Sequence, residues 1–321
     1  YKRQFLYFCL LFIVQTAFAA DSLYVREQQI PILIDRIDNV LYEMRIPAQK
    51  GDVLNEITIQ IGDNVNLSDI QAIRLFYSGV EAPSRKGEHF SPVTYISSHI
   101  PGNTRKALES YSVRQDEVTT PLSRTVKLTS KQPMLKGINY FWVSIQMKPE
   151  TSLLAKVATT IPNAQINNKP IDITWKGKVD ERHVGIGVRQ AGDDGSAAFR
   201  IPGLVTTNNG TLLGVYDIRY NSSVDLQEKI DIGVSRSTDK GQTWEPMRVA
   251  MTFKQTDGLP HGQNGVGDPS ILVDEKTNTI WVVAAWTHGM GNERAWWNSM
   301  PGMTPDETAQ LMLVKSEDDG K

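Results

Sequence analysis

The sequence predicts an all-β protein, and three observations carry that prediction. Residues 55–62 alternate apolar and polar side chains, as half-buried strands do. Residues 73–77 and 140–145 are rich in β-branched and aromatic side chains, which favour strands. Turn residues recur between such segments, and no long helical period is present. Short strands with regular turns are typical of an antiparallel sandwich, which we expect over residues 21–165.

The first twenty residues have a different character. Lys2 and Arg3 precede an apolar run over residues 5–14, and Ala17-Phe18-Ala19 follows. A basic start, a short apolar run and an Ala-x-Ala site are typical of a secretory signal peptide. The run is about half of the roughly 20 apolar residues that a membrane span requires. We therefore expect residues 1–20 to be a signal peptide that exports the protein to the periplasm, cell surface or medium, with no membrane span. Because the first residue is Tyr1, we also expect the N-terminus to be incomplete.

The composition argues against several classes of function. Cys9 is the single cysteine and would leave with the signal peptide, so no disulfide or thiolate nucleophile is expected. The formal net charge is −2 and no basic stripe or nucleic-acid motif is present, which argues against a nucleic-acid partner. The five histidines show no metal-ligand spacing. We expect neither a metal nor another cofactor.

A domain junction is expected over residues 159–178, which are polar and contain two prolines and an Asn-Asn pair. Beyond the junction the pattern is again that of β-structure. A threonine cap at Thr304, followed by a proline and two acidic residues, predicts one short helix. The expected strands lie within residues 203–217 (interrupted by a turn at 208–210), 231–237, 271–274, 279–284 and 310–315.

One short motif occurs twice in this second part. Residues 237–244 have the form Ser-x-Asp-x-Gly-x-Thr-Trp, and residues 316–321 repeat its first six positions. An aspartate in such a turn accepts backbone N–H bonds, the glycine takes a positive φ, and the tryptophan offers an apolar face. A turn motif that repeats in β-structure implies a β-propeller. The residues expected to be structural rather than catalytic are Ser237, Asp239, Gly241, Thr243 and Trp244.

Three polar signatures stand around the first copy of this motif. They are the segment Phe199-Arg200-Ile201-Pro202, the pair Arg219 and Asp225, and Asp268 within Gly-Asp-Pro-Ser. Each has an ordinary interpretation by itself, as a surface arginine or a turn aspartate. Together they offer guanidinium groups, whose planar fork matches a carboxylate, next to carboxyl groups suited to proton transfer.

In this order, the Phe-Arg-Ile-Pro segment and the two Asp boxes resemble the catalytic domain of bacterial exo-α-sialidases (neuraminidases) with Asp-box (BNR) repeats. The resemblance is specific over residues 184–321. Residues 21–165 resemble, through less specific motifs, the β-sandwich that precedes the propeller in some of these enzymes. The resemblance implies an N-terminal β-sandwich followed by the first part of a six-bladed β-propeller, which residues 179–321 would form incompletely.

The resemblance also implies roles for the polar residues. Arg200 would bind the carboxylate of sialic acid, and Arg219 would contact the region of O4 on the sugar. Asp225 would be the general acid/base, and Asp268 would line the sugar pocket. The tyrosine nucleophile of the family, its glutamate and two further arginines lie later in such sequences. No residue up to Lys321 matches them, so these residues alone are expected to be inactive.

Tryptophans in residues 285–303 offer further candidates. Trp286 and Trp296 are expected to wall the sugar pocket, and packing in the propeller core is the alternative for both. For Trp297 the core is the preferred interpretation.

The expected function is therefore that of an exo-α-sialidase, which hydrolyses terminal sialic acid from glycoproteins, glycolipids and oligosaccharides with retention. One alternative is a non-catalytic Asp-box propeller that binds glycans. Another is an Asp-box glycosidase acting on a neutral glucan, which needs no arginine for a carboxylate. A trans-sialidase remains open within the same family. The N-terminal sandwich would either bind carbohydrate or shield and orient the propeller. Linkage preference and oligomeric state do not follow from the sequence.

Overall fold

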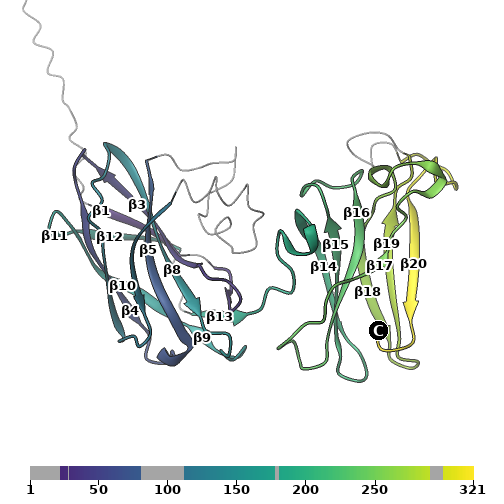
Figure 1. Ribbon diagram of the computed structural model, residues 1–321, viewed down its shortest axis with the longest axis horizontal. Helices are drawn as coiled ribbons and strands as arrows, with labels where there is room; N and C mark the ends of the chain where they lie inside the picture. The colour runs from purple at the N-terminus through teal and green to yellow at the C-terminus, as the bar shows by residue number, and fades with distance from the viewer. Residues whose placement is uncertain (1–21, 28, 81–111, 178–180, 290–298) are drawn as a thin grey trace, which may run out of the picture.

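The computed structural model describes residues 22–27, 29–80, 112–177, 181–289 and 299–321. Figure 1 shows two β-domains side by side, the first coloured purple to teal and the second green to yellow. The regular elements of the described residues are strands and single 3₁₀ turns, as the sequence predicts. Within those ranges, no helix is long and apolar enough to cross a membrane.

The N-terminal domain is a sandwich of a six-stranded sheet, in the order β12-β1-β3-β8-β5-β6, and a four-stranded sheet, in the order β11-β10-β4-β7. A small third sheet, β2-β13-β9, closes one end. The strands of the six-stranded sheet are β1 (Ser22–Glu27), β3 (Asn39–Ala48), β5 (Ile70–Gly79), β6 (Val113–Thr119), β8 (Gly137–Met147) and β12 (Asp172–Lys176). The remaining elements are β2 (Ile32–Leu33), β4 (Leu54–Ile61), the 3₁₀ turn η1 (Leu67–Asp69), β7 (Thr125–Thr129), β9 (Lys156–Val157), β10 (Thr159–Ile166), β11 (Lys169–Pro170) and β13 (Arg182–Gly185).

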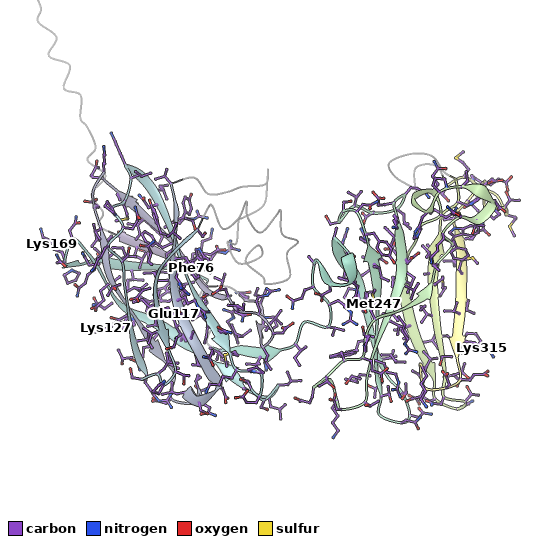
Figure 2. All side chains as sticks on the ribbon, in the orientation of Figure 1. Phe76, Glu117, Lys127, Lys169, Met247 and Lys315 are labelled. Carbon is purple, nitrogen blue, oxygen red and sulfur yellow. The ribbon has the colours of Figure 1, made fainter. Side chains whose placement is uncertain are left out.

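The core of the sandwich lies where the inward side chains of the two sheets meet, as the alternating pattern requires. Ile57, Ile59 and Ile61 of β4 are fully buried there. The three strand segments predicted in this region correspond to β4, β5 and β8, with Gly62 alone lying beyond the end of β4. Lys127 and Lys169 of the four-stranded sheet lie at the outside of the domain in Figure 2.

The domain junction expected over residues 159–178 is not there. That stretch forms β10, β11 and β12, and β12 pairs in parallel with β1 inside the six-stranded sheet. The Asn-Asn pair is the reason for the difference. Asn167 and Asn168 both take positive φ and connect β10 to β11 as a tight hairpin turn, for which asparagine is well suited. The chain leaves the sandwich only after β13, which pairs with β2 and β9.

The second domain consists of two antiparallel meanders. One has four strands in sequence order, β14 (Ala198–Thr206), β15 (Leu212–Arg219), β16 (Ile230–Ser237) and β17 (Arg248–Met251). The other has three, β18 (Val266–Asp274), β19 (Thr279–Trp286) and β20 (Gln310–Ser316). The 3₁₀ turns are η3 (Asp193–Gly195), η4 (Thr256–Gly258) and η5 (His261–Gln263). All the strands predicted beyond the junction are confirmed.

The two meanders pack face to face, as neighbouring propeller blades do. β18 lies against β14, β15 and β16. Their shared core includes Val215 and Ile232 from the first blade and Val266, Val282 and Ala284 from the second. Residues 299–309 form a turn in which the Glu307 carboxylate accepts hydrogen bonds from the backbone and hydroxyl of Thr304, and no helix follows. The predicted cap is present, but the helix is not.

Both Asp boxes form the same turn. In the first, Asp239 accepts from the Ser237 hydroxyl at 2.8 Å and the Thr243 N–H at 2.9 Å, and Gly241 N–H donates to Ser237 Oγ at 2.9 Å. Hydrogen bonds from Thr243 and Ser237 lower the pKa of Asp239 to about 2. Gly241 has φ +86°, a left-handed conformation that residues with a side chain rarely adopt, so glycine suits this position of the turn. These contacts are those of a structural turn.

The second box adds a contact between the blades. Asp319 occupies the position equivalent to Lys240, and both have positive φ. Its carboxylate accepts hydrogen bonds from Thr207 and Thr211, each at 2.6 Å, and from Arg236 at 2.9 Å. Burial raises the pKa of Asp319, but these bonds outweigh it and lower the value to about 2. Asp319 therefore ties the second blade to the first.

Candidate active site

Two arginines hold one carboxylate at the end of the first blade opposite the Asp box. Arg200 Nη1 donates to Asp225 Oδ1 at 2.8 Å, and Arg219 Nη1 donates to the same oxygen at 2.6 Å. Both guanidinium groups also donate to the Ser223 carbonyl, each at 3.0 Å. The side chains of Arg200 and Asp225 are 42% and 36% exposed, so solvent reaches this pair. Three residues predicted from separate motifs thus meet at one place.

Arg219 is held from behind by a buried carboxylate. Its side chain is 1% exposed, and its Nε and Nη2 donate to Asp217 Oδ2 at 3.0 and 2.7 Å. Asp217 is fully buried, and burial raises its pKa to about 6 in spite of Arg219. Burial lowers the pKa of Arg219, but its bonds to Asp225 and Asp217 prevail and raise it. The arginine therefore stays charged and fixed in orientation.

Asp217 is a site residue that was not predicted from the sequence, although its position contains a signal. It stands two residues before Arg219, and residues two apart on a strand face the same side. An Asp and an Arg at that spacing can form an ion pair.

Asp268 enters the site through its backbone. Its N–H donates to Asp217 Oδ1 at 2.9 Å, while its side chain is exposed. Asp268 lies in a bulge of β18 between Gly267 and Ser270, with φ +57°. The first strand of the other blade has the same irregularity between Arg200 and Gly203, where Ile201 has φ +53°.

A positive φ is costly for a β-branched residue such as Ile201, about 1–3 kcal/mol. Both positive-φ residues precede a proline, Pro202 and Pro269. The two bulges are therefore equivalent features of the two blades, and each supplies a predicted site residue. Strain of this kind is concentrated at functional sites in proteins.

The loop that carries Asp225 is anchored by the next residue. Leu226 is buried with Ile230. Gly265 and Gly267 pass beneath this leucine so closely that a Cβ on Gly265 would lie 2.7 Å from Leu226 and 2.3 Å from the Glu228 carbonyl oxygen. The glycines before Asp268 therefore allow the Asp225 loop to lie on β18, which brings the two aspartates to the same edge.

A second polar cluster adjoins the site and was not predicted. Asp231 is 1% exposed and accepts hydrogen bonds from the Tyr220 hydroxyl at 3.0 Å and from His261 Nε2 at 2.8 Å. Burial and the negative charge of Asp231 raise the pKa of Tyr220. Tyr220 directly follows Arg219, and His261 lies in the turn η5 before β18. The cluster therefore connects the end of β15, which carries Arg219, to the turn that precedes β18, which carries Asp268. Nothing in the sequence spacing links these residues.

Of the three candidate tryptophans, the structure describes Trp286. Trp286 is 6% exposed and stacks on Phe253, with ring centres 4.5 Å apart and an angle of 15° between the planes. It belongs to the core between the blades, so its expected role as a pocket wall gives way to the core interpretation. Trp296 and Trp297 lie outside the described residues.

In the part of the chain that the structure describes, no group of three or more His, Cys, Asp and Glu residues has an arrangement that could hold a metal ion. The chemistry available at the site is that of guanidinium groups and carboxyl groups. Such a set can bind an anion and move a proton.

The fold and site together define an Asp-box protein of the β-propeller type, with a β-sandwich before the propeller blades. Residues 20–170 match the family described as the N-terminal domain of BNR-repeat neuraminidase. A sialidase from Bacteroides fragilis (strain YCH46) is 57% identical over 317 residues, 98% of this chain and 58% of the relative. A sialidase from Paraclostridium sordellii is 35% identical over 123 residues, 38% of this chain and 28% of the relative.

A solved structure agrees with these sequence relatives. A Hadza microbial sialidase matches with a TM-score of 0.79 and 60% identity, over 93% of this chain and 57% of that one. Residues 20–170 thus match the N-terminal domain of BNR-repeat neuraminidases, and most of the chain is similar in sequence to microbial sialidases. It spans 58% of the length of the Bacteroides fragilis relative.

Proposed function

We propose that the protein containing these residues is an exo-α-sialidase, which removes terminal sialic acid from glycoproteins, glycolipids and oligosaccharides with retention. The observation that carries the proposal is the convergence of Arg200 and Arg219 on the carboxylate of Asp225. The similarity to proteins named as sialidases supports the same assignment. Arg200 is reached by solvent and already holds one carboxylate oxygen, so it suits a substrate that carries a carboxylate. A neutral sugar would not need such a group.

Arg200 is the group suited to the substrate carboxylate. It is the more exposed of the two arginines, and its partner Asp225 Oδ1 already shows that a carboxylate oxygen fits at 2.8 Å. An incoming sugar carboxylate can take over this hydrogen bond with charge-assisted geometry. Arg219 cannot turn toward it freely, because Asp217 holds two of its nitrogens. Its role is to keep the Asp225 carboxyl in place and to contact the sugar beside it.

Substrate binding would prepare Asp225 for its step. When the sugar carboxylate takes Arg200, Asp225 loses one cationic partner and gains an anion close by. Both changes favour a protonated Asp225, as proton donation to the leaving oxygen requires. The same carboxylate then activates water. The tyrosine nucleophile and glutamate of the family have no match up to Lys321, so the proposal places them in another part of the protein.

The test uses the full-length gene product with Asp225→Asn. Kinetics are compared on an aryl α-sialoside with a good leaving group and on sialyllactose with a poor one. We expect kcat/KM to fall by about 100-fold or more on sialyllactose and much less on the aryl sialoside, because only a poor leaving group needs a proton. Equal losses on both substrates would contradict the role of Asp225. No turnover of any sialoside by the wild-type protein would favour the glycan-binding alternative.

We also propose that the protein is exported, on the basis of the basic and apolar pattern of residues 1–20. N-terminal sequencing of the protein recovered outside the cytoplasm tests this, with a new N-terminus just after Ala19 or Ala20 as the expected result. Recovery of the uncleaved chain from the cytoplasm alone would contradict it.

A further inference from the structure

The six-stranded sheet of the sandwich carries an open groove on its outer face. The groove has a volume of about 360 Å³, within the range of small-ligand sites. It runs over β12, β1, β3 and β8, and β1 and β12 lie on the side of the sandwich away from the second domain in Figure 1. The outward side chains that matter most in it are Tyr24, Arg26, Glu43, Arg45, Ile138 and Lys176.

Strand register places an arginine between two tyrosines across this face. Tyr24 of β1 pairs with Arg45 of β3, and Arg45 pairs with Tyr140 of β8. Neighbouring strands lie about 4.8 Å apart, so the two tyrosines stand roughly 10 Å from each other with the guanidinium between them. The Arg45 guanidinium carbon lies 5.8 Å from the centre of the Tyr140 ring, a cation–π contact that keeps it on the sheet surface.

The groove has more positive than negative charge. Arg26 is paired with Glu43 at 3.7 Å, and Arg45 and Lys176 add two further cations. Among the described residues Arg45 has no carboxylate partner. Its fork is therefore available to a carboxylate from outside the chain, which it can bind through two parallel hydrogen bonds.

The apolar part of the groove is exposed as well. Tyr24 is 47% exposed and Ile138 is 49% exposed, although both are large side chains. A tyrosine ring offers a flat apolar face and a hydroxyl group at low cost in conformational entropy. Flat rings beside a free guanidinium are the combination that an acidic sugar needs, with stacking for its C–H face and an ion pair for its carboxylate.

We propose that this groove is an accessory binding site for an acidic glycan, with Arg45 on the sugar carboxylate and Tyr24 beneath the sugar ring. The choice of sialic acid as that sugar rests on the proposed function, whereas the requirement for a carboxylate rests on the groove itself. Charge complementarity selects this occupant over a neutral glycan.

The test is a binding titration on the full chain carrying Arg200→Ala, which disables the carboxylate site of the blades. Saturation-transfer NMR and calorimetry are run with 3′-sialyllactose, with lactose, and with a disaccharide of glucuronic acid. We expect binding of sialyllactose and none of lactose. Adding Arg45→Ala or Tyr24→Ala should weaken it about tenfold or more. Lys169→Ala is the matched control, because it removes an exposed cation from the other sheet (Figure 2).

The outcomes distinguish the ligands that the groove could bind. Binding of the glucuronic acid disaccharide without sialyllactose keeps an acidic-glycan site but rejects sialic acid as its ligand. Equal binding of lactose, or a dissociation constant unchanged by Arg45→Ala and by the more conservative Arg45→Gln, overturns the proposal. Self-association in sedimentation that Arg45→Glu abolishes also overturns it in favour of a second copy. Because the blade site is disabled throughout, failure here leaves the catalytic proposal untouched, and loss of turnover in Asp225→Asn says nothing about the groove.

Discussion

Aspartates at the two ends of the first blade have pKa values that are shifted in opposite directions. β15 runs from the Asp box, where Leu212 pairs with Ser237, to the arginine site, where Arg219 pairs with Ile230. At the Asp-box end, hydrogen bonds lower the pKa of Asp239 and Asp319 to about 2. At the other end, burial raises the pKa of Asp217 to about 6. A strand only eight residues long therefore separates carboxylates whose charge is stabilised from one whose charge is costly.

The difference shows how to tell a structural carboxylate from one that serves a site. The hydrogen-bond donors to Asp239 come from the turn that this carboxylate itself closes, so the group satisfies the local backbone. At the arginine site the buried Asp217 serves Arg219, and Arg219 serves Asp225, which faces solvent. Burying the charged Asp217–Arg219 pair is unfavourable by itself, but the pair orients Asp225 at the surface.

The largest effect on stability is expected from Arg219→Ala. The substitution leaves Asp217 buried without its cation, which should lower the free energy of unfolding by about 3–5 kcal/mol. Arg200→Ala is the matched control, since its exposed pair with Asp225 should contribute less than about 1 kcal/mol. Urea unfolding of the two variants measures the contrast. Equal losses would mean that the buried pair is not what holds this end together.

A smaller loss is expected from Asp319→Ala at the opposite end. The variant removes the acceptor for Thr207, Thr211 and Arg236, which join the two blades. We expect the free energy of unfolding to fall by about 1–3 kcal/mol. The double variant with Arg236→Ala, measured in the same way, should cost less than the sum of the two single changes, because they share one contact. Strict additivity would argue against this tie.

The two ends should also respond to pH with opposite signs. The pKa of Asp217 in the folded state, about 6, lies above its unfolded value of about 3.9, so the folded state binds the proton more tightly. Its contribution to stability therefore falls as pH rises from about 4 to 6. The pKa of Asp319, about 2, lies below the unfolded value, so its contribution is present above about pH 4 and is lost as pH falls toward 2.

The measurement is the difference in unfolding free energy between the wild type and each Asn variant as a function of pH. Relative to Asp217→Asn, the wild type should lose stability between pH 4 and 6 and then stay level. Relative to Asp319→Asn, it should gain stability between pH 2 and 4. The same sign at both positions would remove the contrast between the two ends.

The smallest stability effect is expected from Ser237→Ala. Its hydroxyl bridges the Gly241 N–H and the Asp239 carboxylate within a single turn. Losing it should lower the free energy of unfolding by about 1 kcal/mol and leave the arginine site unchanged. Thermal unfolding measures the stability loss, and sialoside turnover by the full-length protein measures the effect on the site. A turnover defect without a stability loss would mean that the Asp box influences the arginine site at the opposite end of the blade.

The strand pattern follows from the sequence because it depends on short-range rules, and much of the site follows from the resemblance of its motifs to those of bacterial sialidases. Alternation predicts β4 directly, and the motifs around Arg200, Arg219 and Asp225 identify residues that meet within hydrogen-bond distance. The Asp box, a turn closed by its own side chains, is predictable for the same reason.

What the sequence does not predict depends on contacts between distant segments. Asp231 and His261 are 30 residues apart and meet only because η5 folds back over the end of β16. Trp286 is an aromatic residue at the end of β19, a position that suits a pocket as well as a core, and its stacking on Phe253 decides between them. The Asn167-Asn168 pair has the composition of a linker, and its role as a hairpin turn follows from the pairing of β10 with β11.

The most direct test of the central claim, that Arg200 binds the carboxylate of the substrate, compares a sialoside with its methyl ester on the full-length protein and on Arg200→Ala. We expect the wild type to prefer the free acid strongly. We also expect Arg200→Ala to lower kcat/KM for the acid by about 100-fold or more and to change kcat/KM for the ester little. Equal losses on acid and ester, or an undiminished preference for the acid, would contradict it.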